Sequence, residues 1–581
     1  MYRGAIAAGP ALAPAVPVRR VLALIAVVAC TRDDLDPAVA ALTATLTHQN
    51  PNPVNLSPSG ALVLVKSMHA TTFELEIRRR HDGVVIARDR AGDTQLAPTW
   101  RFDDGALAFL ADRDGDQQHR LFVLDLATGQ RRAIANAPPT QAPALRWEPR
   151  GTRVAYLVAE RGRRERKLVV VDTAATALAP IVALDHLDEH AGFVWSPDGA
   201  WVAGVSHASP GTIAIGRSDG NGRRDVVVAQ PAEIRSLAWS RDGHVLVTLR
   251  REANEHFTLA EVSATTGAVI REVRAGGDIS GPLYLPDGGL AFHVNRDGEV
   301  SVYTCRGQCD EHRRVGPGDG TAVVTGFSPD GREAWILHTG RVSPPALVGV
   351  DLGTGTTATI HAARAEAARD AITGERIDLA SHGLRVPAYL WRAKTVADHA
   401  PAALVRVRGG PSGQAMRSWD PAIQLLVERG VHVISLNYRG SSGYGAAFEN
   451  APVRGNTERV SDVLAARRFA ERELGVPPER IILLGHSYGA ALVAEAVRRD
   501  PRPAGPVALL SYVGPAIAPI TDAPRTIVFH GENDVALSPA DARRRLASFA
   551  PRFVELTHEG HTFRRVGTWA RIYTAVLALL D

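Results

Sequence analysis

The chain has 581 residues, of which 45% are hydrophobic and 22% charged, and its formal net charge at pH 7 is +4. That length corresponds to roughly three to four domains' worth of chain rather than to one core. A charge so close to neutral argues against a nucleic-acid-binding protein. The sequence contains no P-loop, no dinucleotide fingerprint and no metal-ligand cluster, so we predict that the protein needs no cofactor and no metal.

The amino-terminal segment PVRRVLALIAVVAC, residues 17–30, joins two arginines to an apolar run of nine residues that ends at Cys30. The run is too short to span a bilayer and is typical of a secretory signal peptide. Residues 27–30 also resemble the bacterial lipobox, in which the cysteine is lipidated. We therefore predict a lipoprotein signal peptide over 1–30 and a linker over 31–50. The predicted location is the periplasmic side of a bacterial envelope, with Cys30 as the only membrane attachment. A signal peptide cut elsewhere, or an uncleaved anchor, is the alternative.

A repeat accounts for most of the chain that follows. Similar segments occur at NLSPSG, WRFDDG, RWEPRG, VWSPDG, AWSRDG, YLPDG and GFSPDG, and their final glycines lie 43 to 48 residues apart. That period matches one four-stranded propeller blade, in which an aromatic or apolar residue enters a tight turn and an alternating strand follows. The seven copies predict a seven-bladed β-propeller over residues 51–362.

Two of the three cysteines, Cys305 and Cys309, lie close together in the segment YTCRGQCDEH. The pair is too isolated for a zinc site, which needs about four ligands. In an oxidising compartment the two residues could form a small disulfide, with free thiols as the alternative.

The carboxy-terminal part, residues 366–581, contains a nucleophile motif. In IILLGHSYGAALVAEAV, from residue 481, a buried strand runs into G-H-S-Y-G and then into a helix. G-x-S-x-G in this context is a nucleophile elbow, with Ser487 exposed on a strained turn. We therefore predict an α/β-hydrolase domain here.

Acyl transfer at Ser487 also needs donors for the oxyanion. LVRVRGGP, residues 404–411, is a predicted strand ending in a Gly-Gly-Pro turn with exposed backbone. We predict that the oxyanion is bound by the backbone N–H groups of Gly410 and Tyr488, with Gly409 as the alternative to Gly410.

A serine nucleophile also needs a histidine base and an acid, which in this fold follow it in the order acid, then histidine. PRTIVFHGEND, from residue 524, and FVELTHEGHTF, from residue 553, are predicted strands that end in polar loops. Spacing alone leaves several candidates open in these loops and in the segment after them: Glu532, Asp534, Asp541, His530, His558 and His561.

Three segments, HGEND with ALSP, EGHTF and NYRGSSGYG at residues 437–445, resemble motifs of the prolyl oligopeptidase family, in its acylaminoacyl and dipeptidyl peptidase branch. The resemblance extends over nearly the whole mature chain. It implies that Asp534 is the acid and His561 the base, and that the propeller caps the active site, admitting peptides and excluding folded proteins.

The sequence departs from the family's pattern in two places. Arg408 replaces the histidine of the usual His-Gly-Gly-Pro, so it could bind a substrate carboxylate or be a solvated loop arginine. Residues 506–531 run almost directly from one predicted strand to the next, where the family inserts helical structure. A side wall of the substrate pocket is therefore expected to be missing or trimmed.

These features together predict a serine peptidase that acts on oligopeptides through Ser487, Asp534 and His561. Two alternatives stay open. The trimmed pocket could suit esters or amides of non-peptide compounds, or the propeller could be an envelope binding module beside a vestigial hydrolase. No feature of the sequence predicts an oligomeric state.

Overall fold

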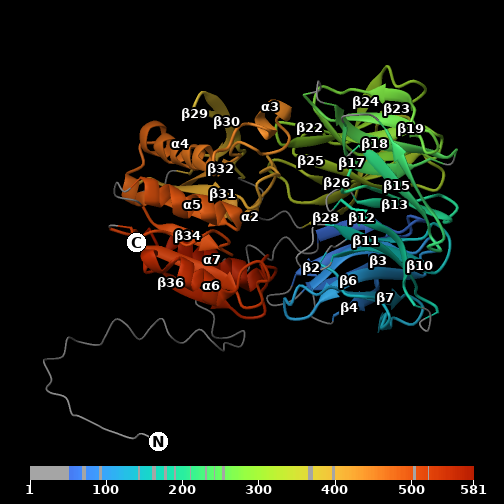
Figure 1. The fold of residues 1–581 in the computed structure, drawn as a ribbon, viewed down its shortest axis with the longest axis horizontal. Coiled ribbons are helices and arrows are strands. Elements are labelled where there is room, and N and C mark those ends of the chain that lie inside the picture. The colour runs from blue at the N-terminus through green and yellow to red at the C-terminus, as the bar shows by residue number, and fades with distance from the viewer. Residues whose placement is uncertain are drawn as a thin grey trace, which may run out of the picture.

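The computed structural model describes residues 52–580, except for residues 69–72, 91–93, 142–143, 160–164, 176–178, 189–191, 210, 229–231, 241, 252–254, 364–370, 395–399, 501–504 and 521. The signal peptide and Cys30 therefore lie outside the described residues. The chain forms a ring of β-sheets beside an α/β domain (Figure 1). None of the described helices is both long and apolar enough to cross a membrane.

The first four blades use consecutive strands. Blade 1 contains β1 (Asn52–Leu56), β2 (Leu62–Met68), β3 (Phe73–Arg79) and β4 (Val85–Asp89). Blade 2 contains β5 (Thr94–Trp100), β6 (Ala106–Asp112), β7 (Arg120–Asp125) and β8 (Arg131–Ala133). Blade 3 contains β9 (Leu145–Trp147), β10 (Arg153–Ala159), β11 (Arg166–Asp172) and β12 (Ile181–Leu187). Blade 4 contains β13 (Phe193–Trp195), β14 (Trp201–Val205), β15 (Thr212–Arg217) and β16 (Arg223–Val227).

Three more blades complete the propeller. Blade 5 contains β17 (Ala232–Trp239), β18 (His244–Arg251), β19 (Thr258–Ser263) and β20 (Val269–Val273). Blade 6 contains β21 (Asp278–Tyr284), β22 (Leu290–Arg296), β23 (Glu299–Cys305) and β24 (His312–Val315). Blade 7 contains β25 (Thr321–Phe327), β26 (Glu333–Thr339), β27 (Ala346–Asp351) and β28 (Thr357–Ala362). The predicted seven-bladed propeller is thus confirmed, and each repeat lies between the first and second strands of its blade.

The repeat's aromatic residues join neighbouring blades. In three consecutive blades, the indole N–H of the tryptophan that ends the first strand donates to the first strand of the blade before. The pairs are Trp100 with Asn55 Oδ1 (2.9 Å), Trp147 with Thr99 O (2.9 Å) and Trp195 with Arg146 O (3.3 Å). A buried indole needs such a partner, so one residue type supplies both apolar contact and a bond between blades.

Blade 7 closes the ring against blade 1. Leu56, Val63 and Val65 of blade 1 pack with Trp335 and Leu347 of blade 7 in one buried cluster. Arg80 and Glu333 add an ion pair of 2.9 Å across the same seam. Among the described strands, every blade draws all four from consecutive sequence, so none is exchanged between blades.

The carboxy-terminal domain is an eight-stranded sheet of order β29-β30-β32-β31-β33-β34-β35-β36. Its strands are β29 (Glu375–Ser381), β30 (Leu384–Trp391), β31 (Ala402–Val407), β32 (Val431–Leu436), β33 (Ile481–His486), β34 (Val507–Leu510), β35 (Thr526–Gly531) and β36 (Arg552–Leu556). The strands from β32 to β36 in this order pair in parallel, and β29 and β30 extend one edge antiparallel.

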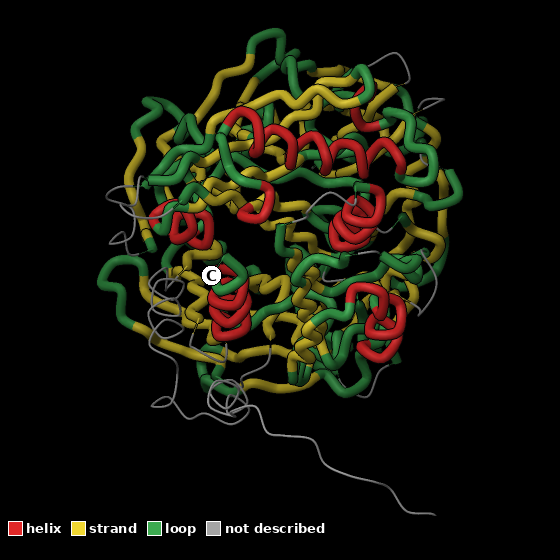
Figure 2. Tube along the Cα trace, turned by 90° about the vertical axis from the view of Figure 1, so that its left-hand side faces the viewer, coloured by secondary structure: helices red, strands yellow, loops and turns green. Residues whose placement is uncertain are grey.

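Helices cover both faces of this sheet. The helices are α2 (Pro421–Glu428), α3 (Ala446–Glu449), α4 (Thr457–Glu473), α5 (Tyr488–Arg499), α6 (Pro539–Arg545) and α7 (Val566–Leu577), with 3₁₀ turns η2 (Pro478–Arg480) and η3 (Ala547–Phe549). One buried core includes residues of α4 and α5, and the core on the opposite face includes residues of α2 and α7. Figure 2 shows the molecule from the end where this domain lies, with the helices in red. The predicted fold class, propeller followed by α/β-hydrolase, is confirmed.

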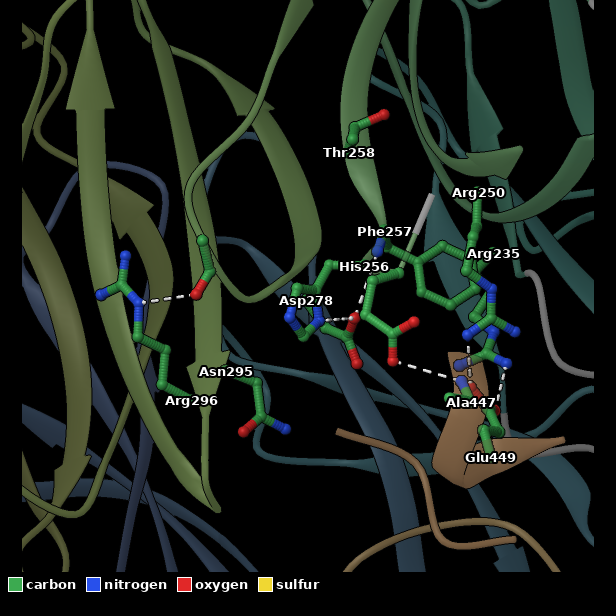
Figure 3. A network of polar contacts seen from close by, with 12 residues as sticks. Arg235, Arg250, His256, Phe257, Thr258, Asp278, Asn295, Arg296, Ala447 and Glu449 are labelled. Carbon is green, nitrogen blue, oxygen red and sulfur yellow. Dashed lines mark hydrogen bonds and ion pairs between the residues drawn. The ribbon is translucent and has the colours of Figure 1, made fainter. Parts of the chain in front are cut away.

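The propeller contacts this domain in several places, one of which is α3. Glu449 of α3 accepts from Arg235 and Arg250 of blade 5, at 2.6 Å in both cases. The two guanidinium groups lie over the ring of Phe257, at 4.1 Å and 4.5 Å from its centroid (Figure 3). This ion-pair network joins two segments that lie about two hundred residues apart in sequence.

Candidate active site

Ser487 occupies a strained turn between β33 and α5. Its backbone has φ 53° and ψ −120°, a conformation that is costly for a residue with a side chain. A Cβ on Gly485 would come within 2.5 Å of Gly489 O, and one on Gly489 within 2.2 Å of Val407 O. Glycine is therefore required on both sides of Ser487, as a nucleophile elbow demands.

The structure brings Ser487, His561 and Asp534 together at one edge of the sheet. Ser487 Oγ lies 2.8 Å from His561 Nε2, and His561 Nδ1 lies 3.0 Å and 2.9 Å from the two carboxylate oxygens of Asp534. Asp534 follows β35 and His561 follows β36, which are parallel neighbours, so their carboxyl ends meet at the same edge. The chain thus positions a hydroxyl, an imidazole and a carboxylate in hydrogen-bonded series.

Asp534 is buried and held as a carboxylate. Burial by itself raises its pKa, but the hydrogen bond from His561, the charges of His561 and His530, and the backbone N–H of Ala536 outweigh that effect and lower the pKa below its usual value. A permanent carboxylate can orient the imidazole and stabilise its protonated form.

The other acids and histidines proposed from spacing have different surroundings. Glu532 accepts a bond from the backbone N–H of His558, and Asp541 lies in the first turn of α6, bonded to Ser538. His558 is exposed and pairs with Asp114 of the propeller at 3.3 Å. His530 is fully buried beneath the site, where its Nε2 lies 2.8 Å from Leu537 O. None of these four contacts Ser487 or His561 through a hydrogen bond among the described residues.

His486, immediately before the nucleophile, packs against the imidazole of His561. The two ring centroids lie 5.9 Å apart. Burial, with the nearby His561 charge, lowers the pKa of His486 to about 4. His486 is therefore neutral near pH 7 and does not repel a protonated His561 beside it.

Two of the three candidate oxyanion donors, Tyr488 and Gly409, lie close to Ser487. Tyr488 begins α5, so its N–H belongs to the first helical turn, where donors have no partner within the helix. On the opposite side, Gly409 approaches so closely that an added Cβ would lie 3.1 Å from Ser487 Cβ. Gly410 is next in the turn, with φ +70°. The alternative donor, Gly409, is thus the glycine in contact with the nucleophile.

Arg408 binds the oxyanion loop itself. Its Nη1 donates to the carbonyls of Gly409 (2.9 Å), Gly410 (3.2 Å) and Ser412 (2.7 Å). The guanidinium lies 4.6 Å from the ring centroid of Tyr438. Arg408 is therefore not a solvated loop arginine, and substrate carboxylate binding by this residue stays a prediction.

The NYRGSSGYG segment braces the same loop. Asn437 bonds both backbone groups of Ala415, and the Tyr438 hydroxyl donates to Gly410 O. Arg439 anchors the segment through a buried ion pair of 2.7 Å with Asp462 of α4. In the sequence, this segment was noted only for its resemblance to a family motif. In the structure, it supports the oxyanion loop.

The propeller reaches the site through the loop between β6 and β7. Gln117 Oε1 accepts from the backbone N–H of His561 (3.1 Å) and of Val535 (3.4 Å). Sequence reasoning missed this residue, because nothing in a one-dimensional pattern relates positions 117 and 561.

Residues 511–525, between β34 and β35, contain no helix in their described part. This agrees with the expectation that the chain lacks a helical insertion before the acid.

In blade 6 of the propeller, Cys305 and Cys309 form a disulfide with a Cα–Cα distance of 5.1 Å.

The chain is similar to several known proteins. Residues 417–503 match the model of the prolyl oligopeptidase family. A protein named dipeptidyl aminopeptidase BIII from Pseudoxanthomonas mexicana is 24% identical over 423 residues, which cover 67% of this chain and 59% of the relative. The match thus spans less than two thirds of that relative's length.

Solved structures extend the likeness to the whole fold. A prolyl endopeptidase superposes with a TM-score of 0.79 at 16% identity, covering 94% of this chain and 91% of the other. A puromycin-hydrolysing peptidase of Mycobacterium tuberculosis gives 0.76 at 18% identity, covering 93% and 95%. Residues 417–503 are therefore similar to the prolyl oligopeptidase family, and the whole chain shares the fold of these solved structures.

Proposed function

We propose that the protein is a serine peptidase that hydrolyses oligopeptides. The observation that supports it most is the hydrogen-bonded series Ser487, His561 and Asp534, located where α5 begins and facing a Gly-Gly-Pro loop. The named relatives, a dipeptidyl aminopeptidase among them, act on peptides by their names, which favours the same substrate class.

The proposed reaction proceeds through an acyl-enzyme. Ser487 Oγ attacks the scissile carbonyl while His561 Nε2 accepts the hydroxyl proton, and Asp534 stabilises the imidazolium. The oxyanion accepts bonds from the N–H of Tyr488 and from the Gly409–Gly410 turn, favoured by the positive end of the α5 dipole. His561 then gives its proton to the leaving amine, and a water molecule, deprotonated by His561, hydrolyses the ester and releases Ser487.

We further propose that the propeller limits access to this site. Support comes from the contacts that place blade 2 against the acid and histidine loops and blade 5 against α3. A folded protein cannot reach a serine enclosed between two domains, whereas a short peptide can.

The test is hydrolysis of short peptide anilides by the purified chain lacking residues 1–30, with Ser487→Ala as control. Free-amino and N-acylated anilides are compared with a simple ester and with a folded protein. Anilide cleavage that needs Ser487 supports the peptidase. Turnover of the ester alone would indicate an esterase instead of a peptidase. Cleavage of the folded protein would contradict the proposal that the propeller restricts access.

We also propose that the protein works in the bacterial envelope, attached through Cys30. The Cys305–Cys309 disulfide is consistent with an oxidising compartment. Mass spectrometry of the mature amino terminus tests this, because a lipidated Cys30 is expected and an unmodified Met1 would contradict it.

A further inference from the structure

A propeller loop lies against both catalytic loops of the C-terminal domain. Residues 113–118 connect β6 and β7 and contact residues 533–535, which carry the acid, and 558–565, which carry the histidine. In Figure 1, blade 2 and the elements β36, α6 and α7 occupy the same lower half of the molecule. The reacting groups of the proposed triad are thus held partly by a different domain.

Gln117 makes the central contact. Its Oε1 accepts from the backbone N–H of His561 at 3.1 Å and of Val535 at 3.4 Å. Both partners are donors, so the amide orientation is fixed by chemistry, since only the oxygen can accept. One side chain therefore bridges the residue that follows Asp534 and the catalytic histidine itself.

Around Gln117, the propeller loop and the histidine loop approach each other closely. A Cβ on Gly115 would lie 2.7 Å from His558 O, and a Cβ on Gly560 would lie 2.7 Å from Gln117 Cγ. Asn533 Nδ2 donates to Asp114 O at 2.9 Å. The two domains thus approach closely here, both between backbone segments and through the side chains of Asn533 and Gln117.

Hydrogen bonds within the propeller loop stabilise its conformation. Asp116 accepts from the backbone N–H of Arg113 (3.3 Å) and of Gln118 (3.0 Å), which closes the loop on itself. Asp114 and Gln117 have positive φ, 52° and 54°, a region that disfavours residues with side chains. The loop's own hydrogen bonds therefore stabilise its conformation, which suits a residue that must fix the position of another.

We propose that Gln117 is a positioning residue for the triad, which makes the propeller part of the catalytic machinery as well as a cover. This inference rests on the proposed function. Gln117 touches no reacting atom, and it acts through the backbone of His561 and Val535. Loss of its acceptor frees the histidine loop to move, and a displacement of about 1 Å at a reacting group costs up to about 100-fold in rate.

The test compares Gln117→Met with Gln118→Met in the chain lacking residues 1–30. Gln118 is a matched control, because it lies in the same loop and its side chain makes no hydrogen bond within the described residues. Gln117→Glu keeps an acceptor at the same reach. Each variant is measured for kcat and KM on a peptide anilide, for the rate at which a fluorophosphonate modifies Ser487, and for thermal unfolding.

We expect Gln117→Met to lower kcat and the fluorophosphonate rate by about 10- to 100-fold, with KM and unfolding temperature close to wild type. Gln117→Glu should recover most of the rate, and Gln118→Met should match wild type. A Gln117→Met variant as fast as Gln118→Met, or one changed in KM alone, would overturn the positioning role while leaving the peptidase intact. A wild-type chain inert to both anilide and fluorophosphonate would overturn the proposed function as well.

Discussion

The propeller and the C-terminal domain differ in how the chain builds them. Each blade uses four strands that follow one another in sequence, whereas the C-terminal sheet places β31 between β32 and β33 and assembles its site from three separate loops. Outside the loop that contacts the catalytic loops, a change in the propeller is therefore expected to have local effects on one blade or seam. A change at the site edge of the C-terminal sheet affects groups brought together from distant positions.

The largest effect is expected at the triad. Asp534→Asn keeps the shape of the side chain but removes the charge that stabilises protonated His561, and it favours the wrong imidazole tautomer. A loss of about 10⁴-fold in kcat is expected, with no change in melting temperature. Steady-state hydrolysis of an anilide checks this, and a variant within tenfold of wild type would exclude Asp534 as the acid.

The next effect concerns backbone packing at the nucleophile. Gly489→Ala would place a methyl group 2.2 Å from Val407 O and 2.4 Å from Arg408 O. We expect a loss of about 3 kcal/mol or more in stability, because backbone at a sheet centre cannot move aside. Gly353→Ala, in a propeller turn whose nearest atom would be 3.3 Å away, is the control. Equal unfolding temperatures for the two variants would refute the packing argument.

Acid should weaken both domains through buried histidines, of which we consider one in each domain. Burial lowers the pKa of His486 in the C-terminal domain and of His293 in blade 6 to about 4. Well above pH 6.5 both residues are neutral whether the chain is folded or unfolded. Between pH 6.5 and about 4 only the unfolded chain takes up the proton, so stability is lost as pH falls, by up to about 3 kcal/mol for each histidine.

His293→Gln and His486→Gln separate these contributions. His293 Nε2 accepts from Val324 N at 3.0 Å, a bond that a glutamine oxygen can replace. Between pH 6.5 and 4, each variant should lose less stability than the wild type does. Thermal unfolding at a series of pH values measures this difference. A variant whose pH dependence equals that of wild type would show that its histidine is not the group that titrates.

The smallest effect is expected at Arg408. Arg408→Met removes the donor to three carbonyls of the oxyanion loop but leaves the bracing by Tyr438 and Asn437. We expect kcat to fall by about 10-fold, less than for direct loss of an oxyanion donor. A rise in KM confined to substrates with a free carboxylate would instead mean that Arg408 binds substrate.

Most of the fold could be predicted from the sequence, because the patterns that indicate it lie within short stretches of chain. The repeat turns occur at one period, and in the structure their glycines mostly take positive φ, as at Gly199 (72°) and Gly331 (71°). Ser487 was likewise marked by glycines that the turn requires. These are positions where a short stretch of chain restricts its own conformation.

The remaining features depend on contacts between distant segments. The choice of His561 over His558 rested on resemblance, and in the structure His558 turns out to pair with a propeller residue. The bond between Gln117 and His561 has no periodic or compositional signal. Contacts of this kind become visible only when the two domains are placed against each other.

The central claim is that Ser487 is a nucleophile activated by His561. Intact-protein and peptide mass spectrometry after incubation with a fluorophosphonate tests it most directly, using wild type, His561→Ala and Ser487→Ala. The account predicts one adduct, located on Ser487 in the wild type, with a rate reduced by at least about 10³-fold in His561→Ala and no adduct in Ser487→Ala. An adduct on another residue, or equal rates for wild type and His561→Ala, would contradict it.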